Sequence, residues 1–320
     1  MIFPSLHRRP HRAITLVELL VTLVIIAILS SLTLTGLAGV RQRTKIEKTK
    51  STIRKIHELI IPRYESYLRR RVPLPSGLTS GTAIARERLA RVRTLLVYEM
   101  PDSWADTGNS IADPWNAGNG TTPIGTGTSA ITSYARTPLV QSYAAFRGSV
   151  SGTSSKSATA FQDHASSECL FLIVSRGLGN PDALEQFRSD EFGDTDLDNA
   201  PEFIDGWGQP IGYVRWPSGA HLLSPPSLLQ VNNASTHHDP FDPFRVDLNA
   251  YALYPLIFSP GPDLIGNISV TPNSGWSPLV GSPGLAPFPA GNFSPLLGSP
   301  NNTASTDAND NISNHSLSAD

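Results

Sequence analysis

An almost unbroken apolar run occupies residues 13–40 of the chain and reads AITLVELLVTLVIIAILSSLTLTGLAGV. No charged residue occurs from Leu19 to Val40, which is 22 positions. At about 1.5 Å per helical residue these positions extend about 33 Å, and this length matches a hydrocarbon core about 30 Å thick. The run therefore predicts a membrane-spanning helix over residues 14–40.

Glu18 is the one carboxylate inside this run. A charge at depth in a bilayer costs about 2.5–3.5 kcal/mol on insertion scales, so Glu18 needs a partner. The segment upstream is short and basic, with no acid and with three arginines, Arg8, Arg9 and Arg12. A secretory signal would place small residues and a cleavage site after the apolar run, whereas this run continues into a long polar segment.

The sequence Ala13-Ile14-Thr15-Leu16-Val17-Glu18 resembles the prepilin motif of the type IV pilin and type II secretion pseudopilin superfamily. The resemblance implies cleavage by a prepilin peptidase between Ala13 and Ile14, then N-methylation of the new amino terminus at Ile14. Ala13 replaces the usual glycine of the family, and Ile14 replaces its usual phenylalanine. The implied location is the cytoplasmic (inner) membrane, crossed once, with leader 1–13 inside and an extracytoplasmic head.

Glu18 would be the fifth residue of the processed chain, where the family keeps a glutamate. Two opposite charges about 4 Å apart attract by about 4 kcal/mol at an effective dielectric constant of 20, before desolvation is subtracted. We expect the amine of one subunit to meet Glu18 of a neighbour and to set the axial register of a filament. The alternative is that Glu18 lies at the level of the lipid headgroups.

Charge divides the chain into a basic front and an acidic body. The whole chain has a net charge of −2, but residues 1–100 hold 18 Lys and Arg against 6 Asp and Glu. Residues 101–320 hold 7 Lys and Arg against 21 Asp and Glu.

The basic residues of 41–55 would place the body in the cytoplasm by the positive-inside rule, so the extracytoplasmic orientation of the head rests on the family resemblance. Aromatic residues do not interleave with the basic ones, and we expect no nucleic-acid partner. The basic residues either pack against acidic heads of neighbouring subunits or are solvated.

A stalk helix is expected to follow the span, over residues 41–72. No proline occurs between Pro10 and Pro62, so the helix is expected to be continuous from Ile14 to Ile61. Four isoleucines lie seven, three and four residues apart, which predicts one apolar stripe packed against the head: Ile46, Ile53, Ile56 and Ile60.

The head, residues 73–273, is predicted to be an α+β fold with helices on a small antiparallel sheet. A second helix is expected over 83–100, a surface insertion over 105–160, and a buried helix over 169–174 that Ser166-Ser167-Glu168 caps and Gly177 ends. Strands are expected over 211–216 and 251–258, with a third at 222–231. The Pro-, Gly-, Ser- and Asn-rich tail, 274–320, is predicted to be partly disordered, above all over 301–320.

Two short stretches of the head resemble those of major pseudopilins. Asp205-Gly206-Trp207-Gly208-Gln209-Pro210-Ile211-Gly212-Tyr213 is similar to their Asp-x-Trp-Gly-x-Pro-x-x-Tyr stretch. Ser259-Pro260-Gly261-Pro262-Asp263 is similar to their Ser-x-Gly-x-Asp loop.

An acidic stretch just before the first of these motifs has the spacing of a calcium-binding loop. Acids occupy positions 1, 3, 5, 9 and 12, namely Asp194, Asp196, Asp198, Glu202 and Asp205. Asn199 stands at position 6, which is usually glycine, and it tolerates the left-handed conformation. The alternative is a solvated acidic turn without Ca²⁺.

The sequence favours a structural protein over an enzyme. Cys169 is the only cysteine, so the chain has no intrachain disulfide, and no Gly-x-Ser-x-Gly, P-loop or dinucleotide-binding motif occurs. We expect a pilin-like filament subunit without catalysis of its own, whose large head favours a minor or specialised role. Its expected partners are other pilin-like subunits, the prepilin peptidase, the inner-membrane assembly platform and the lipid bilayer. The alternative is a membrane-anchored extracytoplasmic binding protein or enzyme with a pilin-like anchor.

Overall fold

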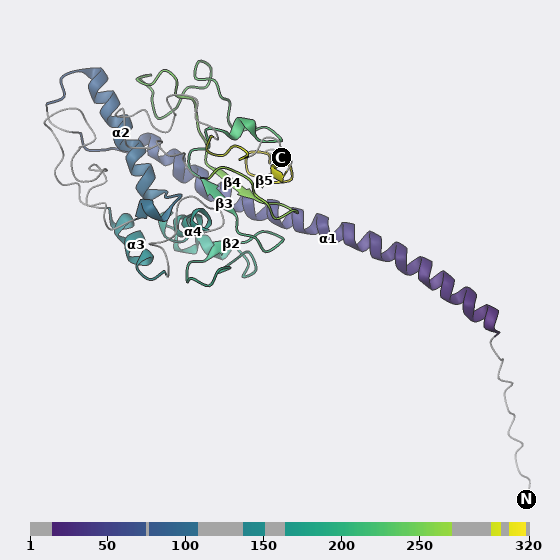
Figure 1. Ribbon diagram of the computed structural model, residues 1–320. Helices are drawn as coiled ribbons and strands as arrows, with labels where there is room; N and C mark the ends of the chain where they lie inside the picture. Colours follow the sequence, from purple (N-terminus) through teal and green to yellow (C-terminus); the bar gives the residue numbers. More distant parts are fainter. Residues whose placement is uncertain are drawn as a thin grey trace, which may run out of the picture. The chain divides into compact units, whose positions relative to one another are not determined.

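The computed structural model describes residues 15–74, 77–107, 137–150, 164–270, 296–301 and 307–317. The chain divides into two compact units, and the boundary between Thr44 and Lys45 falls within the long helix α1, Leu16–Ser66. Figure 1 shows that the other labelled helices and all labelled strands belong to the second unit, which we call the head.

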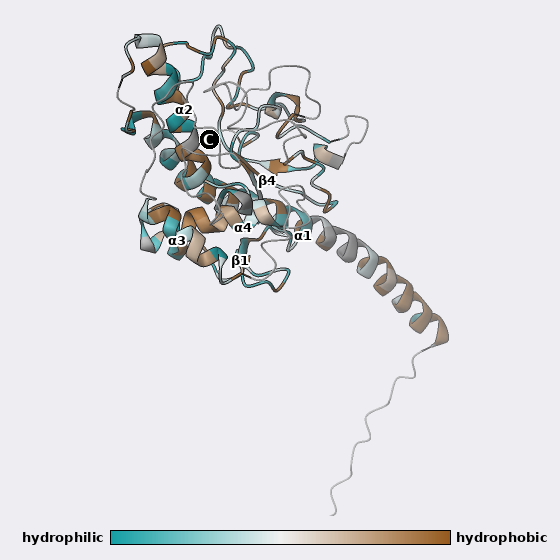
Figure 2. Cartoon of the chain, turned by 60° about the vertical axis from the view of Figure 1, so that its left-hand side comes forward, coloured by the Kyte–Doolittle hydropathy of each residue, from teal (hydrophilic) through white to brown (hydrophobic). Residues whose placement is uncertain are grey.

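The first unit contains the N-terminal part of α1. Its described apolar side chains are exposed along the helix, and Figure 2 shows this stretch as mostly hydrophobic. Within the described residues, no helix combines the length and the apolarity needed to cross a membrane, so the span predicted over residues 14–40 is not confirmed.

The C-terminal part of α1 forms the centre of the head. Ile53, Ile56 and Ile60 are fully buried, and Ile46 packs against the same core, so the predicted isoleucine stripe is confirmed. Each fully buried isoleucine stabilises the fold by about 1.5–3 kcal/mol. Helix α1 continues past Pro62 to Ser66, and a 3-10 helix over Tyr67–Arg69 follows it, so the helical segment ends three residues before the predicted end of the stalk at residue 72.

Two shorter helices accompany α1. Helix α2, Gly81–Glu99, agrees within two residues with the predicted helix and buries Leu89, Val92 and Leu96. Helix α3, Pro138–Arg147, corrects the prediction that residues 105–160 form only a surface insertion. Thr137 caps α3, and Tyr143 of α3 is fully buried, with its hydroxyl donating to the carbonyl of Glu99 (3.2 Å). Within the predicted insertion, residues 108–136 and 151–160 lie outside the described residues.

The buried helix α4 covers Ala165–Leu172, and a π-helical turn over Ile173–Gly177 extends it. The end at Gly177 is as predicted. The predicted cap is wrong, because Ser166, Ser167 and Glu168 lie inside α4 and His164 precedes its first turn with a left-handed φ of 53°. Helix α4 packs through Phe171 on a two-stranded antiparallel sheet of β1, Phe192–Gly193, and β2, Glu202–Phe203.

A second antiparallel sheet has the order β3-β4-β5. Strand β3, Gly212–Val214, pairs with β4, Leu256–Ser259, and both lie at the predicted strand positions. The third strand is β5, Ile312–Ser313, and not the predicted segment 222–231, which contains no strand. The tail is therefore ordered over 307–317, contrary to the prediction of disorder, while residues 271–295 lie outside the described part. The mixture of helices and small antiparallel sheets is the predicted α+β class.

Candidate functional site

The first turn of α1 holds Glu18 in a reciprocal pair with Thr15. Both the N–H and the hydroxyl of Thr15 donate to Oε2 of Glu18 (2.9 and 3.0 Å), and the N–H of Glu18 donates to Oγ1 of Thr15 (3.2 Å). This is a capping box, which satisfies two of the free N–H groups at a helix start. The Thr-x-x-Glu spacing predicts such a box from sequence, so Glu18 has a local partner besides any neighbouring subunit. The predicted cleavage residues, Ala13 and Ile14, lie outside the described residues.

The Asp-x-Trp-Gly-x-Pro motif forms a tight turn around the carboxylate of Asp205. Oδ1 accepts hydrogen bonds from the N–H groups of Trp207 (2.8 Å) and Gln209 (2.9 Å). Oδ2 accepts one from the hydroxyl of Ser259 (2.6 Å), the first residue of the Ser-x-Gly-x-Asp loop. Burial raises the pKa of Asp205, and these hydrogen bonds offset that rise only in part. The two motifs that resemble pseudopilins therefore meet at one buried carboxylate.

Gly206 brings this turn against α1. Its N–H donates to Oγ1 of Thr49 (2.9 Å). A Cβ on Gly206 would lie 2.8 Å from Cα and 2.9 Å from the carbonyl carbon of Lys45, closer than real Cβ contacts come. The motif thus packs backbone to backbone on the part of α1 that belongs to the head, and only glycine fits at this position.

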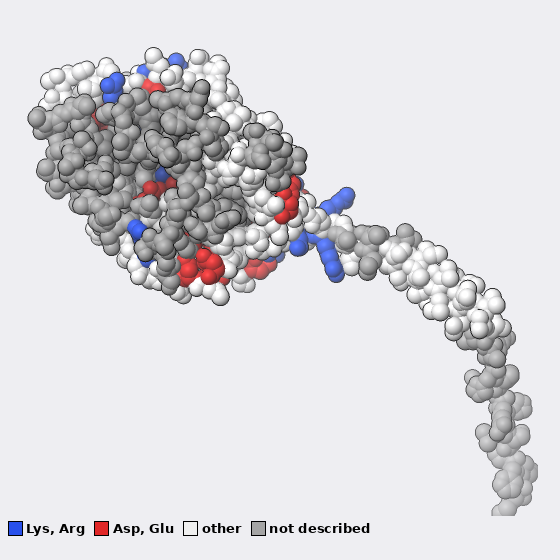
Figure 3. All heavy atoms as spheres, viewed as in Figure 1, with Lys and Arg blue, Asp and Glu red and all other residues white. Residues whose placement is uncertain are grey.

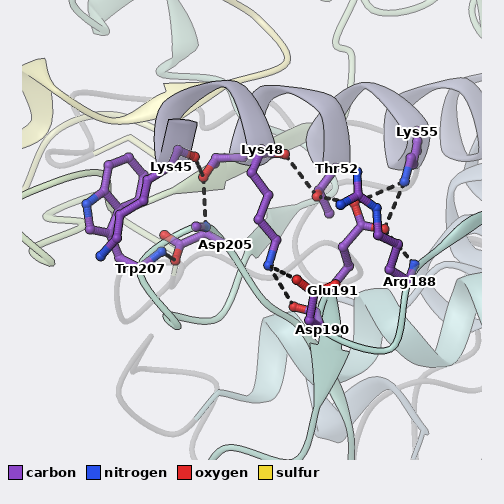
Figure 4. A network of polar contacts seen from close by, with 11 residues as sticks. Lys45, Lys48, Thr52, Lys55, Arg188, Asp190, Glu191, Asp205 and Trp207 are labelled. Carbon is purple, nitrogen blue, oxygen red and sulfur yellow. Dashed lines mark hydrogen bonds and ion pairs between the residues drawn. The ribbon is translucent and has the colours of Figure 1, made fainter. Parts of the chain in front are cut away.

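Ion pairs fix the same face of α1 to the loop before β1. Lys55 binds Glu191 (2.8 Å), which is 1% exposed and also accepts from Oγ1 of Thr52 (2.9 Å). Lys48 binds the more exposed Asp190 (2.7 Å), and Figure 4 shows these α1 side chains directed toward the loop. Burial alone would raise the pKa of Glu191, but hydrogen bonds from Lys55, from the N–H of Arg188 and from Thr52 lower it overall. Basic residues of the predicted stalk therefore pair with acids of the same chain.

The predicted calcium loop divides into two groups of acids. Asp194 shapes the loop, because its carboxylate accepts the N–H groups of Asp198 (3.1 Å) and Asn199 (2.8 Å). Asn199 has the expected left-handed conformation, with φ 74°. Asp194 and Asp205 join no group of converging metal-ligand atoms among the described residues, since Asp205 is bound in the turn.

The other three acids converge with residues that the spacing did not indicate. Atoms of Asp196, Glu202 and His164 lie within 4.8 Å of one another, and so do those of Asp196, Asp198 and Glu168. Nδ1 of His164 is 3.3 Å from Oε1 of Glu202 and 3.9 Å from Oδ2 of Asp196. The contact with Glu202 raises the pKa of His164 above its ordinary value.

The fold explains how His164 reaches Glu202 across the sequence. Glu202 lies on β2 beside Phe203, whose ring is 5.3 Å from that of Phe171 on α4. His164 directly precedes α4, and the packing of α4 on β2 brings its imidazole to Glu202 at the start of β2. Figure 3 shows a group of acidic side chains at the lower edge of the head. The spacing of acids within one loop identifies only residues of that loop. It therefore could not predict His164, which is distant in the sequence.

Residues 8–34 match the family model described as the prokaryotic N-terminal methylation motif, the prepilin-type signature of type IV pilins and pseudopilins. The matched segment contains Ala13, Ile14 and Glu18, so the resemblance drawn from these residues is confirmed there. No curated protein and no solved structure matches the chain.

Proposed function

We propose that this chain is a pilin-like structural subunit of a type II secretion pseudopilus or of a type IV pilus-like filament. The observation that carries the proposal is the N-terminal methylation motif over residues 8–34. In this proposal a prepilin peptidase cleaves between Ala13 and Ile14. Residues 14–40 then anchor the chain in the cytoplasmic (inner) membrane, with the head extracytoplasmic and without catalysis of its own.

The contacts between α1 and the rest of the head support this role. A subunit that enters a filament through its N-terminal helix has to move its head together with that helix. Here three kinds of contact hold α1 in the head: the buried isoleucines, the backbone packing of Gly206 and the Lys55–Glu191 ion pair. The proposed partners are other pilin-like subunits, the prepilin peptidase, the assembly platform and the bilayer.

The single native cysteine allows a clean crosslinking test, because Cys169 is fully buried. Cysteines introduced singly at the exposed Val17 and Leu20 of α1 are oxidised in cells of the native host. We expect disulfide-linked dimers of the chain, or mixed species with another pilin-like protein. A second variant that also carries Ala13→Leu, which blocks peptidase cleavage, is expected to give none. The proposal would be contradicted if the cysteine variants that keep Ala13 gave no linked species. It would also be contradicted if the variants that carry Ala13→Leu were linked to the same extent.

A further inference from the structure

We propose that His164, Asp196 and Glu202 form a binding site for a divalent transition-metal ion of the zinc class. The site lies between the start of α4 and the start of β2 in the head. It is independent of filament assembly, and it differs in ligands and in metal class from the calcium loop that the acid spacing predicts.

The buried carboxylate of Glu202 is the observation that points to a cation. The side chain is 0% exposed, and its Oε2 accepts the N–H of Thr195 (3.0 Å). Its Oε1 accepts no well-formed hydrogen bond from the described residues, and its polar neighbour there is Nδ1 of His164 at 3.3 Å. A buried carboxylate that faces an imidazole and a second carboxylate is costly to keep charged, and a cation bound between the three side chains would offset this cost.

The distances fit a small ion. Ligand atoms about 2.0–2.2 Å from a tetrahedral zinc ion lie about 3.3–3.6 Å from one another. The His164–Glu202 distance is 3.3 Å, and the His164–Asp196 distance of 3.9 Å needs only a small rotation of the Asp196 side chain. Nδ1 of His164 is also 3.1 Å from the hydroxyl of Thr195, a contact that metal binding would replace.

The ligand types decide the class of metal. Calcium takes six to eight oxygen ligands, and imidazole nitrogen is not one of its usual ligands. One neutral imidazole with two carboxylates is a typical donor set for zinc and similar ions. The two carboxylates neutralise a charge of +2, so no net charge is buried. Partial exposure of the His164 and Asp196 side chains, 20% and 29%, leaves a side from which water can complete the coordination.

The test measures Zn²⁺ binding to the full chain in detergent by competition with a chromophoric chelator, and Co²⁺ binding by its visible absorption. His164→Asn is the preferred variant, because asparagine tolerates the left-handed backbone at this position. Asp196→Asn and Glu202→Gln are the other ligand variants. His237→Asn is the matched control, since His237 is exposed and outside the cluster.

We expect one Zn²⁺ ion per chain, and binding weakened at least about tenfold in His164→Asn and Asp196→Asn. Zn²⁺ is also expected to raise the melting temperature of the wild type and of His237→Asn, but not of His164→Asn. Equal Zn²⁺ affinity in the wild type and His164→Asn would overturn the proposal. It would also be overturned by Ca²⁺ binding that depends on Asp196 and not on His164. Should Glu202→Gln fail to fold, the two partly exposed positions still decide the outcome.

Discussion

Gly206 lies against the backbone of Lys45, so that a single added carbon would be 2.8 Å from Cα of Lys45. The contact explains why glycine stands between Asp205 and Trp207. Asp205 closes the turn with its carboxylate, and Gly206 lets that turn approach α1 closely enough for its N–H to reach Thr49. The Asp205-Gly206-Trp207 turn therefore attaches the surrounding part of the head to α1.

Replacing Gly206 by alanine is expected to destabilise the head by about 1–3 kcal/mol, because the added Cβ meets backbone atoms that cannot rotate away. The measurement is chemical unfolding of the full chain in detergent. Gly81→Ala is the control, since a Cβ there has nothing within 4 Å. A Gly206→Ala chain as stable as Gly81→Ala would show that the turn does not bear on α1.

Glu191→Gln is expected to destabilise the head by about 2 kcal/mol at neutral pH, because Lys55 and Thr52 lose a buried charged acceptor. The lowered pKa of Glu191 gives the sign of the pH dependence. Its contribution is complete above the ordinary carboxyl pKa of 4.5 and disappears as the pH falls through the lower folded value.

Unfolding of the wild type and of Glu191→Gln between pH 3 and pH 7, roughly the range over which carboxylates titrate, checks this expectation. Asp190→Asn is the matched control, because that carboxylate is 61% exposed and solvent screens its pair with Lys48. A difference between wild type and Glu191→Gln that stays constant down to the lowest pH would disprove the role of the charge.

His315 is expected to make the C-terminal segment sensitive to acid. Its Nε2 faces the carbonyl of Tyr254 (3.1 Å) and its Nδ1 faces the hydroxyl of Ser227 (2.8 Å), a pattern that the neutral ring satisfies. Burial lowers the pKa of His315 from 6.5 to about 4. The unfolded chain therefore binds a proton that the folded chain does not, and stability falls as the pH drops from 6.5 toward 4, by about 3 kcal/mol in all.

His315→Gln keeps a donor and an acceptor but cannot titrate, so its stability is expected to vary less over this pH range. His237→Gln, at an exposed position, serves as the control and is expected to follow the wild type. Identical pH profiles for all three chains would show that His315 does not contribute.

Glu18 allows a separation of its two roles. Glu18→Gln keeps an oxygen that accepts from Thr15 but has no charge, whereas Glu18→Ala loses both. If charge sets the register between subunits, both variants are expected to lose most of the crosslinking at Val17 and Leu20. Normal crosslinking in Glu18→Gln together with loss in Glu18→Ala would assign the effect to the capping box.

Periodicity predicted the elements that pack by a continuous apolar face. The stripe of Ile53, Ile56 and Ile60, helix α2 and the paired strands β3 and β4 each follow such a pattern. Strand β5 was missed because Ile312 is the only apolar residue of a two-residue strand in a tail rich in Asn and Ser. Helix α3 was missed although Thr137-Pro138 is a typical helix start.

The candidate sites were predictable only where they are local. Spacing found Asp196 and Glu202 but also included Asp205, because spacing does not distinguish a ligand from a carboxylate that closes a turn. His164 joins them through packing of α4 on β2, a contact between distant segments that no local pattern records.

Intact-mass spectrometry of the full chain purified from its native host tests the central claim most directly. Prepilin-type processing predicts a polypeptide that begins at Ile14, lacks residues 1–13 and carries one methyl group on its amino terminus. Fragment ions should place that methyl group on Ile14. A chain that begins at Met1, or one cut elsewhere and unmethylated, would contradict the account.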